Sequence, residues 1–182
     1  MESPTTATSK VEITNVPSLL AFTTTTATSV LPCSKKAKQR PTVATLPPLD
    51  EFIANLFKRS QLPPSICLVS LIYLQRLKTS LPRHARGDLD TPYRLFLAAI
   101  LTASKFMSEA GSALTSQAIA EMTDHVYSSK DVNLMERSFL GLIKYDLFVN
   151  VEAIKDYLAL HGRLLEMDLI EHVMEQQQQQ QQ

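Results

Sequence analysis

The sequence of 182 residues contains no tryptophan and only four glycines. The glycines stand alone, so they form neither a dinucleotide-binding Gly-x-Gly-x-x-Gly fingerprint nor a phosphate-binding P-loop. With ten prolines against four glycines, the chain has little material for phosphate-cradling loops. These absences exclude the nucleotide-binding enzymes that depend on glycine-rich loops.

Cysteine is equally scarce, since Cys33 and Cys67 are the only two and lie far apart. No disulfide framework and no zinc-ligand spacing can be built from them, which favours a reducing compartment. Cys67 lies within the apolar run 66–74, and this context predicts an inert core thiol and not a nucleophile.

Recognisable catalytic constellations are also missing. The four histidines form no His-x-x-x-His or His-Glu-x-x-His pair, and there is no Gly-x-Ser-x-Gly elbow. Asp88 and Asp90 precede a helix start, where we interpret them as loop charges favoured by the helix dipole and not as paired catalytic carboxylates. We therefore expect no enzymatic activity, no metal or other cofactor, and no small-molecule substrate.

The formal charge is balanced, with 18 basic and 18 acidic residues, which argues against bulk nucleic-acid binding. The balance hides two unlike parts. Residues 1–45 carry five basic and two acidic side chains, whereas the remainder carries 13 basic and 16 acidic ones. The first part has no apolar run longer than residues 19–22, which is too short for a signal-peptide core or a membrane span, so we expect no membrane partner.

Residues 1–45 are rich in Ser, Thr and Pro and lack sustained apolar periodicity, so we predict a disordered basic arm. Its basic cluster is either a nuclear-import signal or a solvated patch, and it consists of Lys35, Lys36, Lys38 and Arg40. At the other end we expect residues 164–182 to form a C-terminal helix that frays into the glutamine tract 176–182.

Between these tails the pattern predicts one helix after another, without sustained period-two alternation. Helices are expected at 49–59, 64–81, 91–105, 115–127 and 128–145, and a sixth at 150–160 that extends to 175 in its longest form. Thr91, Ser128 and Asn150 provide the caps, and Ser128 begins a capping box with Asp131.

Two of these helices contain long stretches without charge, at 61–75 and at 95–104. A helix that is apolar all round is buried, and two such helices in a small domain must both lie at its centre. The sequence therefore predicts an all-α domain over residues 46–163 with central buried helices.

The residues of these helices resemble a known family. Tyr73-Leu74-Gln75-Arg76-Leu77, the string from Tyr93 to Phe106, and Val132 to Leu140 followed by Tyr145-Asp146-Leu147 have the order and spacing of the cyclin box. The loop from Leu81 to Gly87 is similar to that of the fungal PCL-type (Pho-type) cyclins, within the branch linked to cell-cycle entry and polarity. The resemblance covers residues 49–160.

This resemblance implies a single five-helix cyclin box that binds and activates the catalytic subunit of a cyclin-dependent protein kinase. It implies a heterodimer that helps to direct substrate choice in cell-cycle entry and polarity or in nutrient signalling, in the nucleus and cytoplasm. The implied kinase-binding residues are Lys105, Glu136, Phe106, Met135 and Phe139. On the residues alone, Lys105 could simply end its helix beside the dipole, with Glu136 on a solvated face.

The sequence departs from the family at residues 107–111, in having no tryptophan, and in lacking the Met-Arg-Ala-Ile-Leu docking patch of mitotic cyclins. An alternative function is a non-kinase helical adaptor of the transcription-factor cyclin-fold type, although such modules are typically tandem and basic. The basic residues Arg76, Lys78, Arg83 and Arg86 either contact acidic or phosphorylated segments or belong to a solvated loop.

Overall fold

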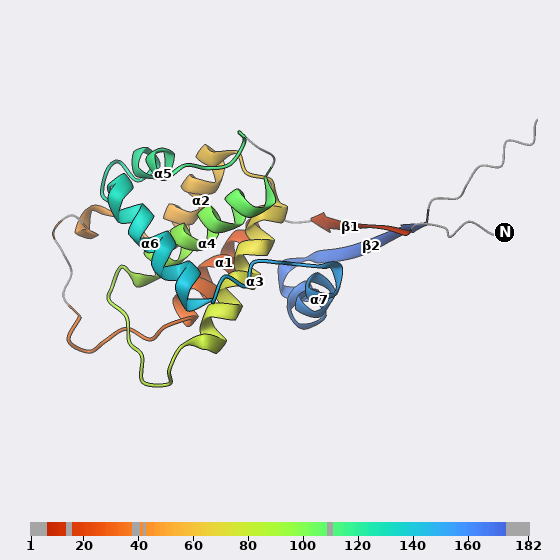
Figure 1. Cartoon of the computed structure of the whole chain (residues 1–182), viewed down its shortest axis with the longest axis horizontal. Coiled ribbons are helices and arrows are strands. Elements are labelled where there is room, and N and C mark those ends of the chain that lie inside the picture. Colours follow the sequence, from red (N-terminus) through yellow and green to blue (C-terminus); the bar gives the residue numbers. More distant parts are fainter. Residues whose placement is uncertain (1–6, 14–15, 38–40, 42, 109–110, 174–182) are drawn as a thin grey trace, which may run out of the picture. The chain divides into compact units, whose positions relative to one another are not determined.

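A computed structural model of the chain describes residues 7–13, 16–37, 41, 43–108 and 111–173 (Figure 1). The chain divides into two compact units. One unit runs from Val16 to Phe148, and the other combines the described residues of 1–15 with those from Val149 onward. Each unit is described by itself.

The larger unit is built from helices. They are α1 (Val16–Ser29), the short 3₁₀ helix η1 (Val43–Thr45), α2 (Leu49–Ser60), α3 (Pro64–Ser80), α4 (Thr91–Met107), α5 (Ser116–Met122) and α6 (Ser129–Leu142). Helices α2 to α6 are the five expected from the sequence, with α5 and α6 shorter than predicted. The all-α class and the five-helix set of the cyclin box are confirmed.

The core of this unit is formed by α3 and α4, as expected from their lack of charge. Every residue of α4 from Phe96 to Ser104 is buried, and α3 buries its residues from Ile66 to Leu74. Helix α4 packs against α1, α2, α3 and α6, and Figure 1 shows it between these neighbours. Burial on all sides is what an uncharged helix of this kind requires.

The helix starts follow the expected local chemistry, with one difference. Ser128 and Asp131 form the predicted capping box, in which the Ser128 hydroxyl accepts a hydrogen bond from the Asp131 N–H at 3.1 Å. Thr91 is the first residue of α4 and not its cap, a position that Asp90 occupies. The Thr91 hydroxyl instead accepts a hydrogen bond from the Asp88 N–H at 2.7 Å, which closes the loop before α4.

The prediction of a disordered arm over residues 1–45 is wrong for Ala7–Ile13, which form the strand β1, for Val43–Thr45, which form η1, and for Val16–Ser29, which form α1. This helix buries Leu19, Thr23 and Ala27, which share one face because they are spaced four residues apart. Two of the three are not large hydrophobic residues, so the stripe is invisible to a search for apolar periodicity.

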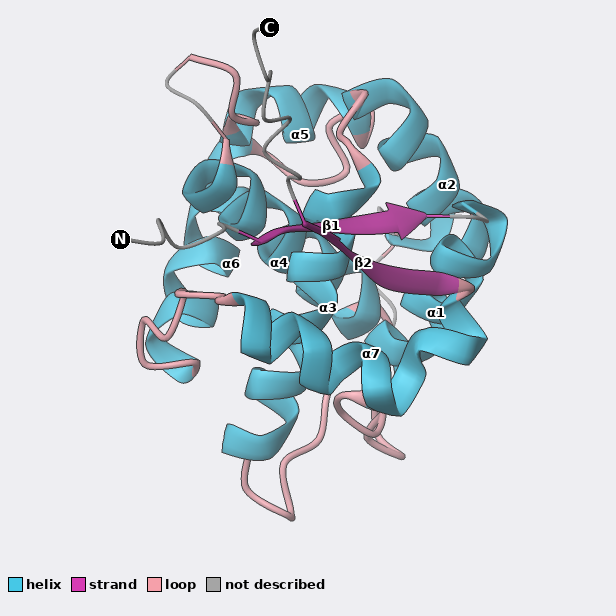
Figure 2. Cartoon of the chain, turned by 90° about the vertical axis from the view of Figure 1, so that its right-hand side faces the viewer, coloured by secondary structure: helices cyan, strands magenta, loops and turns pink. Residues whose placement is uncertain are grey.

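The smaller unit contains α7 (Val151–Leu165) and an antiparallel pair of strands, β1 (Ala7–Ile13) and β2 (Met167–Val173), drawn in magenta in Figure 2. Asn150 caps α7 as predicted, its side-chain oxygen accepting from the Ala153 N–H at 2.8 Å. The expected helix over 164–182 is wrong for residues 167–173. Helix α7 ends at Glu166, whose φ of 49° is left-handed and turns the chain into β2. The glutamine tract lies outside the described residues.

Candidate partner-binding surface

The structure brings together the two charged residues that the sequence singled out. Lys105 lies in the last turn of α4 and Glu136 in the middle of α6. The Lys105 ammonium donates to both carboxylate oxygens of Glu136, with Nζ to Oε2 at 2.8 Å and Nζ to Oε1 at 3.0 Å. The pair therefore links the last turn of α4 to the middle of α6.

This ion pair lies at the edge of the core, with the Lys105 side chain 42% exposed and the Glu136 side chain 17% exposed. An ammonium group has three donor hydrogens and a carboxylate has about four acceptor sites, so neither group is saturated by the other. A partner that approaches from solvent can therefore accept from Lys105 and donate to Glu136 without breaking the pair.

Large apolar side chains adjoin the pair along the chain. Phe106 and Met107, which directly follow Lys105, are 46% and 45% exposed. Exposed aromatic and Met side chains grouped with a fixed charge are typical of a protein–protein contact surface. Of the predicted apolar contacts, Phe106 is the one available at this surface.

Met135 and Phe139 occupy a different position from the one their predicted role suggests. They are only 6% and 2% exposed, so they belong to the core face of α6. They line the floor of a cavity between α4 and α6, together with Ser138 and Leu142. In the chain alone both side chains are buried, and their role in kinase binding stays a prediction.

The segment that follows α6, residues 145–148, is anchored to α3 by Arg76. Its two guanidinium nitrogens donate to the Asp146 carbonyl at 2.7 Å and to the Phe148 carbonyl at 2.9 Å. The Tyr73 hydroxyl donates to the Leu147 carbonyl between them at 2.8 Å, and burial raises the pKa of this hydroxyl to about 12. Arg76 is thus engaged within the chain, and the suggestion that it contacts an external acidic segment is not supported.

Part of the basic cluster that we interpret as either a nuclear-import signal or a solvated patch lies next to the loop before α4. Lys35 and Lys36 are exposed, whereas Lys38 and Arg40 lie outside the described residues. The segment before Lys35 pairs with Gly87, since the Ser34 N–H donates to the Gly87 carbonyl and the Gly87 N–H to the Pro32 carbonyl, both at 2.8 Å. A Cβ at Gly87 would lie 2.7 Å from the Thr91 hydroxyl, so this close approach requires glycine.

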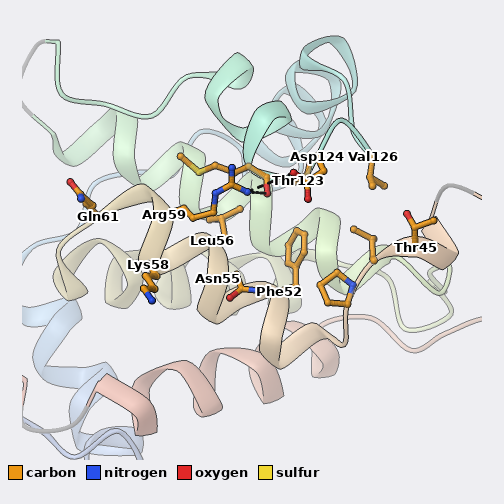
Figure 3. A pocket seen from close by; sticks show the side chains of 13 residues that line it. Thr45, Phe52, Asn55, Leu56, Lys58, Arg59, Gln61, Thr123, Asp124 and Val126 are labelled. Carbon is orange, nitrogen blue, oxygen red and sulfur yellow. Dashed lines mark hydrogen bonds and ion pairs between the residues drawn. The ribbon is translucent and has the colours of Figure 1, made fainter.

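A second surface feature is a pocket of about 700 Å³ beside α2 (Figure 3). Phe52 and Leu56 line it from α2, and Thr123 and Asp124 from the segment after α5. Arg59 crosses it, donating to the Met122 carbonyl at 2.9 Å with its guanidinium 3.9 Å from the Asp124 carboxylate. The sequence did not reveal this pocket because its two sides are 63 residues apart along the chain.

Within the described ranges, no group of three or more His, Cys, Asp or Glu side chains is placed to hold a metal ion. Burial raises the pKa of the Cys67 thiol to about 11, partly offset by hydrogen bonds to Thr23 and Ser70, so this thiol stays protonated at neutral pH. In the same part of the chain, no helix is long and apolar enough to cross a membrane.

Comparison with known proteins matches residues 18–148 to the family described as "Cyclin, N-terminal domain". This range coincides closely with the larger unit and includes α1. Three similar proteins from Saccharomyces cerevisiae are PHO85 cyclin-1, PHO85 cyclin-2 and PHO85 cyclin-9. The first is 37% identical over 107 residues, which is 59% of this chain and 38% of that protein.

The other two relatives are more distant but align over similar lengths. PHO85 cyclin-2 is 25% identical over 134 residues, or 74% of this chain and 43% of that protein. PHO85 cyclin-9 is 25% identical over 113 residues, or 62% of this chain and 36% of that protein. The aligned part thus spans about two fifths of the length of these curated relatives.

Proposed function

The chain belongs to the cyclin family, and from this membership we propose that it is a regulatory subunit that binds and activates a cyclin-dependent protein kinase. Its role is regulatory and not catalytic. The observation that carries the proposal is the doubly hydrogen-bonded Lys105–Glu136 pair beside the exposed Phe106 and Met107, on helices that lie within the matched range.

The proposed partner is a kinase of the PHO85 type. The three relatives are all named as PHO85 cyclins, and their aligned regions cover between 59% and 74% of this chain. The loop from Leu81 to Gly87, which resembles that of PCL-type cyclins, supports the same partner. By the same resemblance, the process is cell-cycle entry and polarity or nutrient signalling, and the complex acts in the nucleus and cytoplasm.

The mechanism we propose is a population shift in the kinase. Kinase activity requires a glutamate of the αC helix to pair with the lysine of strand β3, and the position of αC controls that pairing. Helices α4 and α6 pack directly on each other through buried residues and so present Lys105 and Glu136 in fixed positions. A rigid surface that binds only the active position of αC shifts the kinase toward that state.

The energy of this contact comes mainly from apolar burial. A stable complex buries at least about 1,200 Å² in total. Phe106 and Met107 supply the large exposed side chains next to the pair. Lys105 and Glu136 would bond kinase backbone groups and set the orientation, because fixed charges add specificity more than raw affinity.

Affinity purification from cells tests the proposal. We expect the full chain to recover a kinase catalytic subunit, and the Lys105→Ala and Glu136→Ala variants to lose it while keeping native helical content. Lys130→Ala, an exposed position at the start of α6, is the matched control and should retain the kinase. Equal kinase recovery with the Lys105→Ala/Glu136→Ala double variant would refute the assignment. Recovery of promoter-bound factors without any kinase would instead favour the adaptor function.

A further inference from the structure

The cavity between α4 and α6, which Met135 and Phe139 line, is a second candidate binding site. Its volume is about 270 Å³, and its apolar lining includes Leu95, Phe139 and Leu142. This is just below the range of about 300–1,000 Å³ for sites that hold whole small molecules, so the space suits one or two side chains. Leu142 is 46% exposed at its rim, so an apolar group that entered would cover surface now in contact with water.

The rim of this cavity is basic. Arg86 and Arg94 both line it, against a single carboxylate, Asp88. The chain as a whole is neutral and its residues after 45 are acidic in sum, so a basic rim is a local concentration of charge and not the average of the surface. The pairing of Gly87 with residues 32–34 brings the exposed Lys35 and Lys36 to the same loop, which adds further positive charge beside Arg86.

Arg94 is the residue that points most directly to a ligand. It is only partly exposed and lies in the first turn of α4. Within the described part of the chain, its guanidinium takes part in no side-chain hydrogen bond or ion pair, while its backbone N–H donates to the Asp90 carbonyl at 3.1 Å. A guanidinium with five free donors beside an apolar cavity is suited to a carboxylate that arrives with an apolar neighbour.

We infer that this cavity is a docking site for an acidic linear segment of a partner protein, in which an apolar side chain enters between α4 and α6 and a flanking Asp or Glu pairs with Arg94. Arg86, Lys35 and Lys36 extend the attraction to further acidic residues. Asp88 is the one carboxylate among the residues that line the cavity. Arg86 and Arg94 outnumber it, so the site keeps a net positive charge.

The docking site is separate from the proposed kinase contact. Arg94 and Lys105 are 11 positions apart on α4, which is about 16 Å along the helix axis at 1.5 Å per residue. On α6, the cavity is lined by Ser138 and Leu142, whereas Glu136 lies on the opposite flank of the core stripe. An acidic segment can therefore bind while the other surface is occupied, and the inference does not depend on the identity of the kinase.

Titration of the full chain, labelled with ¹⁵N, against pools of short peptides tests the inference. One pool places Leu or Phe between Asp and Glu residues, and the matched pool places them between Lys and Arg residues. We expect the acidic pool alone to shift amide signals of residues 86–95 and 135–142, with an affinity that falls as salt is raised from about 50 to about 500 mM. Shifts by both pools alike, by the basic pool, or confined to other helices would overturn the inference, as would no shift by either pool.

Variants separate the two halves of the site. Arg94→Glu should weaken binding of the acidic pool by at least about tenfold, since a charged hydrogen bond becomes a repulsion. Leu142→Ser should weaken it several-fold through the apolar half, and this exposed position can change without opening the core. Arg137→Glu makes the same charge change at an exposed α6 position outside the cavity and should leave binding unchanged. Equal loss in Arg94→Glu and Arg137→Glu would reduce the effect to net charge and overturn the assigned site.

Discussion

The Thr23 hydroxyl lies 3.3 Å from the Cys67 sulfur, and this contact joins α1 to the fully buried face of α3. Both residues are completely buried, and the Thr23 hydroxyl also donates to the Leu19 carbonyl at 2.7 Å within α1. A Thr side chain can be buried here because its polar atom is bonded on both sides. Helix α1 is therefore part of the helical core and not an appendage to it.

Leu19→Ala should destabilise the chain by about 2–4 kcal/mol, because Leu19 is completely buried on the inner face of α1 and its removal leaves a cavity. Urea unfolding followed by circular dichroism measures the change. Thr25→Ala, on the exposed side of the same helix, is the control and should alter the free energy of unfolding by less than about 0.5 kcal/mol. If both variants were neutral, α1 would not be packed on α3 in solution.

Of the α-helices in the larger unit, α1 is the one that the sequence analysis failed to predict. Residues 13–34 contain no charged side chain, a longer uncharged run than the one at 61–75 that correctly indicated a buried helix. The four consecutive Thr residues obscured it, because Thr has low intrinsic helix propensity. In the structure, Thr23, Thr24, Thr25 and Thr28 each donate back to the carbonyl four residues earlier, so their hydroxyl groups find partners within the helix itself.

The two candidate sites also differ in how far the sequence could predict them. The meeting of Lys105 and Glu136 was anticipated from the cyclin-box resemblance, whereas the residues alone left open a helix-ending Lys105 and a solvated Glu136. The α4–α6 cavity could not be anticipated, since Leu31 and Arg86 reach it only through the pairing of residues 32–34 with Gly87. The strand pair had no local signal either, because it joins segments from opposite ends of the chain.

Exchange of the two charges, in the double variant Lys105→Glu/Glu136→Lys, should leave stability within about 1 kcal/mol of the original chain. Partly exposed ion pairs contribute little, and the exchanged pair can form again. Kinase recovery should still be lost, because the donor and acceptor presented to the partner are reversed. Thermal unfolding together with pull-down on the same samples measures both. A variant that melts normally and also retains the kinase would contradict the proposed role of the pair.

Arg76→Lys should loosen the segment after α6 although the charge is kept. A lysine cannot donate to the Asp146 and Phe148 carbonyls at the same time in the forked geometry of a guanidinium. We expect a loss of about 1–2 kcal/mol in the free energy of unfolding and faster amide exchange over residues 145–148. Lys78→Arg on the same helix is the control and should change neither quantity. Unaltered exchange in Arg76→Lys would mean that Tyr73 alone holds the segment.

Thiol labelling at about pH 8 should modify one cysteine in the native chain and both in denaturant. Cys33 is exposed, whereas Cys67 is buried with its pKa raised to about 11, so its thiolate is scarce below that pH. Labelling of the Cys33→Ser variant isolates Cys67 and should be slow until the chain unfolds. Rapid native labelling of Cys67 would show that α3 opens locally, contrary to its central place in the fold.

The same thiol predicts the alkaline limit of stability. Cys67 ionises near pH 9 when unfolded and near pH 11 when folded, so between these values the unfolded chain has lost a proton that the native chain keeps. Ionisation then favours unfolding, and the free energy of unfolding should decrease as pH rises from 9 to 11, by at most about 1.4 kcal/mol per pH unit from this group. Urea unfolding across that range measures the slope. The Cys67→Ala variant should be less stable at every pH because the buried side chain is lost. Its free energy of unfolding should nevertheless decrease less steeply between pH 9 and 11. An unchanged slope would assign the alkaline sensitivity to other groups.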